Sequence, residues 1–454
     1  MKKINYIIAL VFLIGLSAQA QTKAWTLEEC VQYALKNNIT IKQTELDTIL
    51  TTIDKREALG NFLPSANLNA NHSWNIGLNQ DITTGLLRNQ TTQMTGIGAN
   101  VGVDIYRGLQ NQNTMRRAKL SIVASKYQLV KMQEDIALNV ANAFLQVLFN
   151  KENLKVQQEQ LAINEKQYTR SEELVKAGSI PRGDLLDIKA TVASNKQNVI
   201  TAENTLLLSK LSLAQLLQLK EFWDFDVIDD TNLQDENNVM SIKPIDIYAK
   251  AKESRTELKI AQTNLEIAEK DVAIAKGGYQ PTLTAYYGFN SRISYADTFD
   301  PATGQVGPAP PAWDQLNDNK GQNFGLQLNI PVFNGFSVRN NVDRNKVNLE
   351  KSKIALEKVD LDLQRNVYTA FTDAKGAMNA HESAIVAMEA REEAYNYAKE
   401  KYAVGLMNSF DLNQAQTLLT NAQSEVARSK YDYIFKIKIL EFYFGIPIAQ
   451  IMKK

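Results

Sequence analysis

The sequence predicts an α+β membrane protein built from two copies of one unit, in which strands able to cross a bilayer alternate with very long helices. Three observations carry this prediction. A fixed offset of 227 residues relates two long segments, each of these segments contains an unusually long helical stretch, and four other stretches alternate apolar and polar residues.

The first twenty residues have the pattern of a secretory signal peptide. Two lysines precede an apolar run from Ile4 to Leu16, and residues 18–20 read A-Q-A, which is a cleavage motif. The apolar run is shorter than the roughly 20 residues of a membrane-spanning helix, so an anchor is the weaker interpretation. We expect residues 1–20 to be removed on export.

Both halves of the remaining chain begin with a helical pattern. These patterns cover Thr26–Leu59 and Ile245–Lys276, and each leads into a stretch that contains glycine and proline. Pro64 in the first half matches Pro281 in the second. We expect one helix in each half, followed by the first strand behind its proline.

Four stretches alternate apolar and polar residues with a period of two. Their apolar members run through Ala66–Ile76, Ile97–Ile105, Leu283–Phe289 and Phe324–Val332. Alternation over roughly ten residues is typical of a strand with one apolar face, and such a strand is long enough to cross a bilayer within a barrel. We expect long polar loops within each strand pair, at about 78–94 and 296–322.

Very long helices follow each strand pair. Between Gly108 and Gly178 there are 69 residues without glycine or proline. As a helix this segment would reach on the order of 100 Å. The matching segment, Phe336–Val404, contains Gly376 and no proline. Since globular helices average about a dozen residues, these two segments predict extended, supercoiled helices.

The chain breaks its long helices twice in the same way. Gly178 and Gly405 are each followed six residues later by an aspartate, Asp184 or Asp411. Glycine ends a helix by adopting a left-handed backbone, and a carboxylate in the first turn of the next helix is favoured by the helix dipole. We therefore expect two helical hairpins with equivalent tips. Asp184 and Asp187 share a helix face.

Four strands are too few to close a membrane barrel. An open sheet edge leaves backbone groups without partners in lipid, and the smallest familiar barrels have about eight strands. The chain must therefore pool its strands with other copies. Two, three or four copies would give eight, twelve or sixteen strands, continued by a tube of helices.

Composition and motifs argue against several other classes of protein. Lysine plus arginine and aspartate plus glutamate number 50 each, which leaves no basic footprint for nucleic acid. Cys30 stands alone, and His72 and His381 lie near no second metal-ligating residue, so no metal or cofactor is expected. Common nucleotide-binding, metalloprotease and hydrolase motifs are missing, so we expect no catalytic residues and no enzyme activity.

The order and spacing of these features resemble the TolC-like outer membrane efflux and secretion channels. The duplication, the strands behind Pro64 and Pro281, the Y-x-V-G tip at Tyr402–Gly405 and the A-G tip at Ala177–Gly178 carry this resemblance. It implies a homotrimer in the outer membrane of a Gram-negative bacterium, with a twelve-stranded β-barrel continued by a periplasmic α-helical barrel.

The resemblance also implies a domain order and a function. The domains would be a first repeat over 21–219, an equatorial linker over 220–243, a second repeat over 244–446 and a tail over 447–454. The chain would be the passive exit duct of a tripartite efflux or type I secretion system, bound to a periplasmic adaptor (membrane fusion) protein and an inner-membrane transporter. The alternative is a non-conducting coiled-coil adhesin or periplasmic spacer.

The resemblance finally assigns roles to the two hairpin tips. Asp411 matches a family aspartate that lines the channel constriction, Gln414 replaces a second one, and Met407 replaces a family arginine. The constriction residues would be Asp411, Asp184, Asp187 and Gln414; the gate latch would be Tyr402, Asp184 and Met407; and the adaptor docking residues would be Ala177, Gly178, Ser179, Val404, Gly405 and Leu406. Ordinary capping, packing or turn formation is the alternative role for each.

Overall fold

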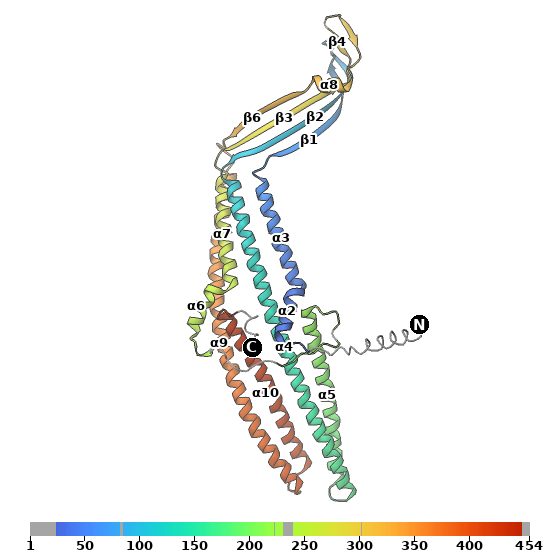
Figure 1. The fold of residues 1–454 in the computed structure, drawn as a ribbon, viewed down its shortest axis with the longest axis vertical. Helices are drawn as coiled ribbons and strands as arrows, with labels where there is room; N and C mark the ends of the chain where they lie inside the picture. Colours follow the sequence, from blue (N-terminus) through green and yellow to red (C-terminus); the bar gives the residue numbers. More distant parts are fainter. Residues whose placement is uncertain (1–23, 82–84, 222, 230–238, 301, 447–454) are drawn as a thin grey trace, which may run out of the picture. The chain divides into compact units, whose positions relative to one another are not determined.

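The computed structural model describes residues 24–81, 85–221, 223–229, 239–300 and 302–446 (Figure 1). The expected signal peptide and the tail over 447–454 lie outside the described residues. The elements in chain order are α2 (Leu27–Asn37), α3 (Ile39–Gly60), β1 (Ser65–Gln80), β2 (Leu87–Arg107), α4 (Gln110–Lys176), α5 (Arg182–Leu217), η1 (Val239–Ser241), α6 (Pro244–Ser254), α7 (Thr256–Gly277), β3 (Thr282–Ser294), β4 (Thr298–Asp300), β5 (Gln305–Gly307), α8 (Ala312–Asp318), β6 (Gly321–Asn329), α9 (Ser337–Ala403) and α10 (Ser409–Tyr443).

The predicted duplication is confirmed in the helices. α4 and α9 both have 67 residues, and they begin 227 residues apart at Gln110 and Ser337. α2 and α6 have 11 residues each, and α3 and α7 have 22 each. The returning helices differ by one residue, with 36 in α5 and 35 in α10. The main helices of the two halves therefore correspond one to one, whereas the strands differ in length and β4, β5 and α8 occur only in the second half.

The single helix predicted at the start of each half is wrong, because each is two helices. The backbone leaves the helical region at Asn38 and at Arg255, which are equivalent positions in the two halves. Asn38 Nδ2 donates to the carbonyl of Leu216 at 3.0 Å, whereas Arg255 donates to the Glu134 carboxylate at 3.0 Å. Neither break contains glycine or proline, so the sequence pattern did not reveal it.

The described chain divides into two compact units. One comprises the described residues within 47–126 and 260–356 and contains the strands. The other comprises the described residues within 1–46, 127–259 and 357–454 and contains the two hairpins. Helices α4 and α9 contribute residues to both units. None of the described helices is both long and apolar enough to span a bilayer.

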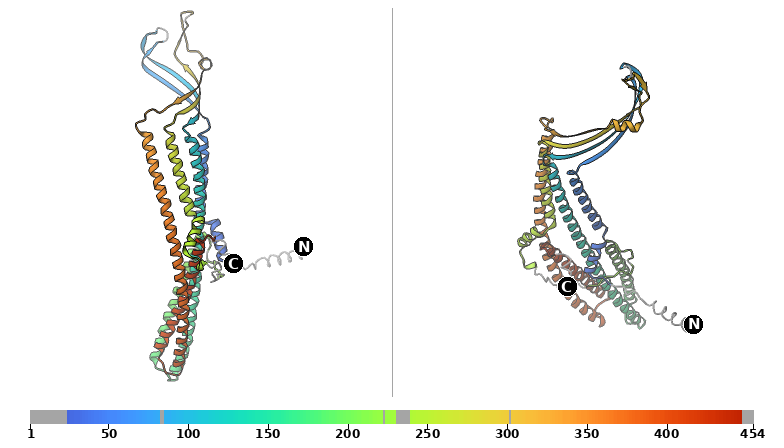
Figure 2. Two further views of the ribbon diagram at one scale, coloured as in Figure 1. Left: turned by 90° about the vertical axis from the view of Figure 1, so that its left-hand side faces the viewer. Right: turned by 45° about the horizontal axis from the view of Figure 1, so that its top comes forward.

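The strand unit is built on one antiparallel sheet with the order β1-β2-β3-β6 (Figures 1 and 2). The central β2–β3 pair joins the two halves of the chain, and β1 and β6 are the edges. Apolar side chains occupy one face, for example in the register Ala66, Val101, Tyr287 and Phe324. The predicted alternation and the four predicted strands are thereby confirmed, although β6 ends at Asn329, before the Val332 expected.

The predicted loops of this unit are wrong. β1 has 16 residues and β2 has 21, so most of the loop expected at 78–94 is strand. The stretch at 296–322 contains β4, β5 and α8. Gln315 of α8 accepts from the Ser294 backbone nitrogen at 2.8 Å and donates to its carbonyl at 2.9 Å. Beyond the end of β6, side-chain amides thus take the hydrogen-bonding place of a strand next to β3. The polar composition of the stretch could not predict this arrangement.

The hairpin unit has its core where α2, α4, α5, α10 and residues 225–227 meet. Phe144, Leu217 and Val227 are fully buried there, and so is Cys30. Asp226 ties this core to the first hairpin, because Lys151 and Lys210 each lie 2.9 Å from its carboxylate. Burial alone would raise the pKa of Asp226, but hydrogen bonds from these two lysines outweigh it and lower that pKa.

Candidate functional site

Both hairpins turn at a glycine in the left-handed region. Gly178 has φ +72° and Gly405 has φ +79°. The residue after each glycine donates its backbone N–H five positions back, Ser179 to the Leu174 carbonyl at 2.8 Å and Leu406 to the Lys401 carbonyl at 2.9 Å. This is the bond of a Schellman motif, which satisfies the last carbonyls of a helix. The two tips therefore have the same backbone geometry.

The helices that leave the two tips begin differently. α5 starts after Pro181 without a side-chain cap, whereas Asn408 Oδ1 accepts the Asp411 backbone N–H at 2.8 Å and caps α10. Asp184 and Asp411 each occupy the third helical position, near the positive end of the helix dipole. Asp184 is half-buried and Asp411 is exposed. The tips are alike in turn geometry and unlike in charge environment.

A groove of about 1010 Å³ separates the two tips. Its lining is mixed, with apolar, aromatic and cationic side chains and one carboxylate. The lining residues are Ile163, Lys166, Gln167, Arg170, Leu174, Ser179, Ile180, Pro181, Asp184, Tyr395, Lys399, Tyr402, Ala403, Gly405, Leu406, Met407, Asn408 and Leu412. Both hairpins contribute to it, so it exists only where they meet.

The structure brings part of the expected site together in this groove. All the expected latch residues line it, and so do half of the expected docking residues. The expected residues in the groove are Ser179, Asp184, Tyr402, Gly405, Leu406 and Met407, and those outside it are Ala177, Gly178, Asp187, Val404, Asp411 and Gln414. Asp187, Asp411 and Gln414 are exposed. The expected constriction residues thus lie outside the groove except for Asp184.

Tyr402 is the polar group of the groove with the most unusual environment. Its hydroxyl is buried and has no hydrogen-bond partner among the described residues. Asp184 lines the same groove without bonding to it. A buried hydroxyl without a partner costs roughly 1–3 kcal/mol, so a state in which Tyr402 gains a partner would be favoured by that amount. A latch between the two residues remains a prediction.

Sequence reasoning missed several groove residues. Lys166, Arg170 and Lys399 are exposed and make no ion pair within the described part of the chain. Tyr395 lies beside them, and burial raises the pKa of its hydroxyl. These side chains stand one to three turns from the tips, on α4 and α9. The sequence motifs of the tips do not extend to these side chains. The spacing of 163, 167, 170 and 174, which averages about 3.5 residues, could have indicated the α4 side of the groove.

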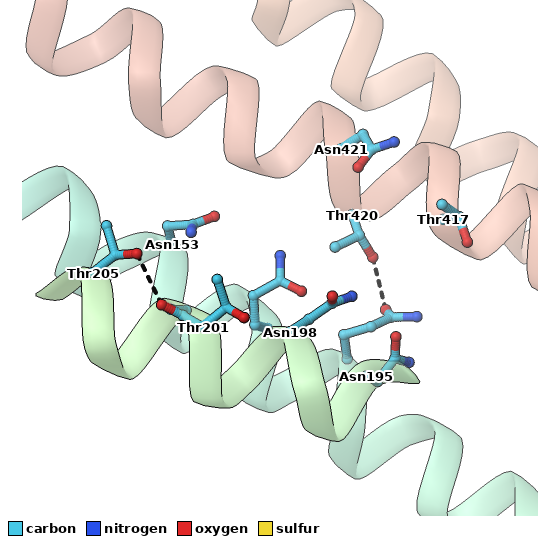
Figure 3. A pocket seen from close by; sticks show the side chains of 11 residues that line it. Asn153, Asn195, Asn198, Thr201, Thr205, Thr417, Thr420 and Asn421 are labelled. Carbon is cyan, nitrogen blue, oxygen red and sulfur yellow. Dashed lines mark hydrogen bonds between the residues drawn. The ribbon is translucent and has the colours of Figure 1, made fainter. Parts of the chain in front are cut away.

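An uncharged polar interface continues along the hairpins. A cavity of about 270 Å³ lies between α4, α5 and α10 and is lined by asparagine, glutamine and threonine side chains and by Ala202. Figure 3 shows these side chains from close by. We call this interface the amide seam, defined by Asn153, Gln157, Gln160, Asn164, Gln167, Thr191, Asn195, Asn198, Asn413, Gln416 and Thr420. Its α4 members recur at alternating spacings of four and three, a signal that counting apolar residues alone overlooked.

The amide seam is only partly hydrogen-bonded. Thr420 Oγ1 donates to Gln160 Oε1 at 2.8 Å, and Asn413 Nδ2 donates to Thr191 Oγ1 at 3.4 Å. In contrast, Asn164 and Gln416 are each 1% exposed, and neither side chain has a hydrogen-bond partner in the described chain. Buried amides without partners weaken a helix interface, so the two hairpins are joined less tightly here than by an apolar seam.

Comparisons with known proteins agree with this architecture. A family model described as outer membrane efflux protein matches residues 30–218 and 247–438. The outer membrane protein TolC of Escherichia coli strain K12 is 24% identical over 444 residues, which cover 96% of this chain and 84% of TolC. The pyoverdine export outer membrane protein OpmQ of Pseudomonas aeruginosa is 23% identical over 345 residues, or 72% of this chain and 64% of OpmQ.

A solved structure shows the same fold. The crystal structure of the Campylobacter jejuni CmeC outer membrane channel matches with a TM-score of 0.77 at 18% identity, over 92% of this chain and 85% of that chain. The family match takes in both structural repeats and omits residues 219–246 between them. The matched segments make up well over half of the chain. The chain therefore belongs to the outer membrane efflux protein family and is a protein of the Gram-negative outer membrane.

Proposed function

We propose that three copies of this chain form the passive exit duct of a tripartite efflux system. The observation that carries the proposal is a four-stranded sheet with two unpaired edges, β1 and β6, in a chain that also sends out two equal helical hairpins. Backbone groups at a sheet edge need partners in lipid. Three copies joined β6 to β1 would supply those partners and close a twelve-stranded barrel.

The hairpin tips are the proposed docking site for a periplasmic adaptor protein. The tip residues Ala177, Gly178, Val404, Gly405 and Leu406 are exposed, and the groove beside them offers apolar surface flanked by unpaired cations. A partner bound there would link the duct to an inner-membrane transporter, which would supply the energy. The cargo is then selected by the transporter, and the duct conducts it.

Cysteine cross-linking tests the docking proposal. A cysteine at Val404, which is 70% exposed, should cross-link to an adaptor protein in intact cells. The matched position is Glu400, which is also exposed and lies about one turn back along α9. Comparing the cross-linking of cysteines at Val404 and Glu400 shows whether the contact is confined to the tip. Equal capture at Val404 and at a distant exposed position such as Trp313 would argue against tip docking.

Asp411 is the proposed charge-selective residue of the constriction. Its carboxylate is exposed, lies outside the groove and makes no ion pair among the described residues, so it is available to face the duct axis. Three copies near the axis would attract cations. Asp411→Asn should reduce cation selectivity and block by divalent ions in planar bilayers. Unchanged selectivity and block in that variant would remove the assignment.

Tyr402 and Asp184 are the proposed latch of the entrance. They line one groove from different hairpins, and the buried Tyr402 hydroxyl lacks a partner. Opening would separate the hairpins across the weakly bonded amide seam. Tyr402→Phe combined with Asp184→Ala should raise single-channel conductance, and an unaltered conductance would sink this idea. A non-conducting spacer, the rival interpretation, would give no channels in any of these measurements.

A further inference from the structure

The polar face of the sheet carries an alternating arrangement of asparagine and glycine. We call it the amide–glycine lattice. Its two cross-strand rows, each running over β1, β2, β3 and β6, are Asn69–Gly98–Asn290–Gly321 and Asn67–Asn100–Gly288–Asn323. No position in these rows carries a charge.

The amides of the lattice lie flat over glycines of the adjacent strand. A Cβ atom added to Gly98 would come within 2.8 Å of Asn69 Oδ1, and one added to Gly321 within 2.6 Å of Asn290 Oδ1. Asn100 Nδ2 also donates to Asn69 Oδ1 at 3.3 Å. Any side chain larger than hydrogen at these glycines would push the amides away from the sheet, so glycine keeps this face smooth.

Charged residues of the same face lie outside the lattice. Arg292 belongs to the row on one side. On the other side lies the uncharged row Ser65–Gly102–Tyr286–Gly325, followed by the row of Asp104, which is paired with Arg107 at 3.3 Å. The opposite face presents Leu68, Val101 and their apolar neighbours, which suit contact with lipid. In a closed barrel the lattice therefore faces the interior.

We infer that the amide–glycine lattice lines the duct at the level of the membrane and makes that level indifferent to the charge of the solute. This inference rests on the proposed channel function. Amides offer hydrogen-bond donors and acceptors without net charge, so neither cations nor anions are held by ionic attraction. Charge selection is then left to the hairpin tips, where Asp411 lies.

A pair of glycine substitutions on one strand tests the smooth wall. Gly98→Ala would lift the Asn69 amide into the duct and should lower single-channel conductance of the purified protein in planar bilayers. Gly102→Ala is the matched control, because an added Cβ there meets only a backbone oxygen at 4.0 Å, and it should leave conductance unchanged. Equal effects of the two variants, or no effect of either, would overturn the inference.

A charge substitution tests the neutrality of the wall. In the Asp411→Asn background, Asn100→Asp should raise the ratio of cation to anion permeability, measured as a shift of reversal potential in a salt gradient. The parent variant, whose lattice is neutral, should select weakly. An Asn100→Asp duct that is no more cation-selective than its parent would contradict a duct-lining lattice.

Labelling separates a failure of the lattice from a failure of the channel proposal. In liposomes, a membrane-impermeant maleimide should label Asn100→Cys and spare Val101→Cys, while native Cys30 is fully buried. The reverse pattern would overturn the inference. If the wild type inserts without conducting while this pattern holds, the channel proposal fails and the interior position of the lattice is supported.

Discussion

At the residue scale, the two tip glycines are required for their backbone conformation and not for lack of space. Gly178 and Gly405 have positive φ, and nothing lies within 4 Å of an added Cβ at either position. An L-residue in the left-handed region costs about 1–2 kcal/mol. Gly405→Ala should therefore destabilise the second hairpin by about that amount, seen as a lower thermal midpoint by circular dichroism.

Gly183 provides the control for this prediction. It lies in the first turn of α5, has no positive φ, and an added Cβ would again meet nothing within 4 Å. Alanine is favoured over glycine inside a helix by roughly 0.5–1 kcal/mol, so Gly183→Ala should leave stability equal or higher. A loss of stability in Gly183→Ala that matches the loss in Gly405→Ala would show that tip packing, and not φ, is decisive.

At the element scale, the duplicated helix break is stabilised by different chemistry in each half. Arg255 is 4% exposed, bonds to Glu134 and Glu257, and lies 3.7 Å from the centre of the Phe442 ring. Its equivalent, Asn38, makes only uncharged contacts: it donates to the Leu216 carbonyl and accepts from the Thr40 backbone N–H. Burial raises the pKa of Glu134, and Arg255 opposes that rise.

Arg255→Asn tests this difference, because it transplants the residue of the first half into the second. It leaves Glu134 without its cation, and breaking such a pair typically costs about 3–5 kcal/mol when buried, somewhat less here since Glu134 is partly exposed. We expect a clear fall in the denaturant midpoint. Lys252→Ala, which removes a largely exposed ion pair between α6 and Asp360 of α9, should change this midpoint little.

The linker contact of Asp226 predicts a pH dependence. Its pKa is lowered in the folded state by Lys151 and Lys210, against the effect of burial. A carboxyl with a lowered folded pKa stabilises the fold above its unfolded pKa of about 3.9, and that contribution is lost as pH falls through the lower folded value. Thermal midpoints of the wild type and Asp226→Asn should therefore differ at pH 7 and converge below about pH 4. A constant difference would exclude ionisation of Asp226 as the cause.

The sequence predicted the elements that are determined by residues within the element itself. Glycine placement determined the tips at Gly178 and Gly405, and the absence of breakers predicted α4 and α9. The breaks at Asn38 and Arg255 escaped, because bonds to residues far along the chain produce them. The extension of β1 and β2 escaped because residues 79–80 and 88–93 are polar on both faces. The groove escaped because two hairpins must meet to form it.

At the scale of the whole molecule, insertion depends on which face of the sheet meets lipid. Leu326 and Gln327 are adjacent on β6, pair with Ala285 and Thr284, and point to opposite faces. A lysine on the lipid face near the bilayer centre costs about 2–4 kcal/mol, whereas a lysine on the interior face remains hydrated. With three copies in one barrel, this cost is incurred three times.

Leu326→Lys should therefore deplete the oligomer from the outer-membrane fraction, while Gln327→Lys should leave it assembled. The measurement is the amount of unheated, detergent-resistant trimer on a gel, compared with the total protein of each variant. Since the two substitutions add the same charge one residue apart on the same edge strand, a difference between them reports the face and not the strand. Equal assembly of both variants would mean that β6 does not present Leu326 to lipid, and the barrel would have to be closed another way.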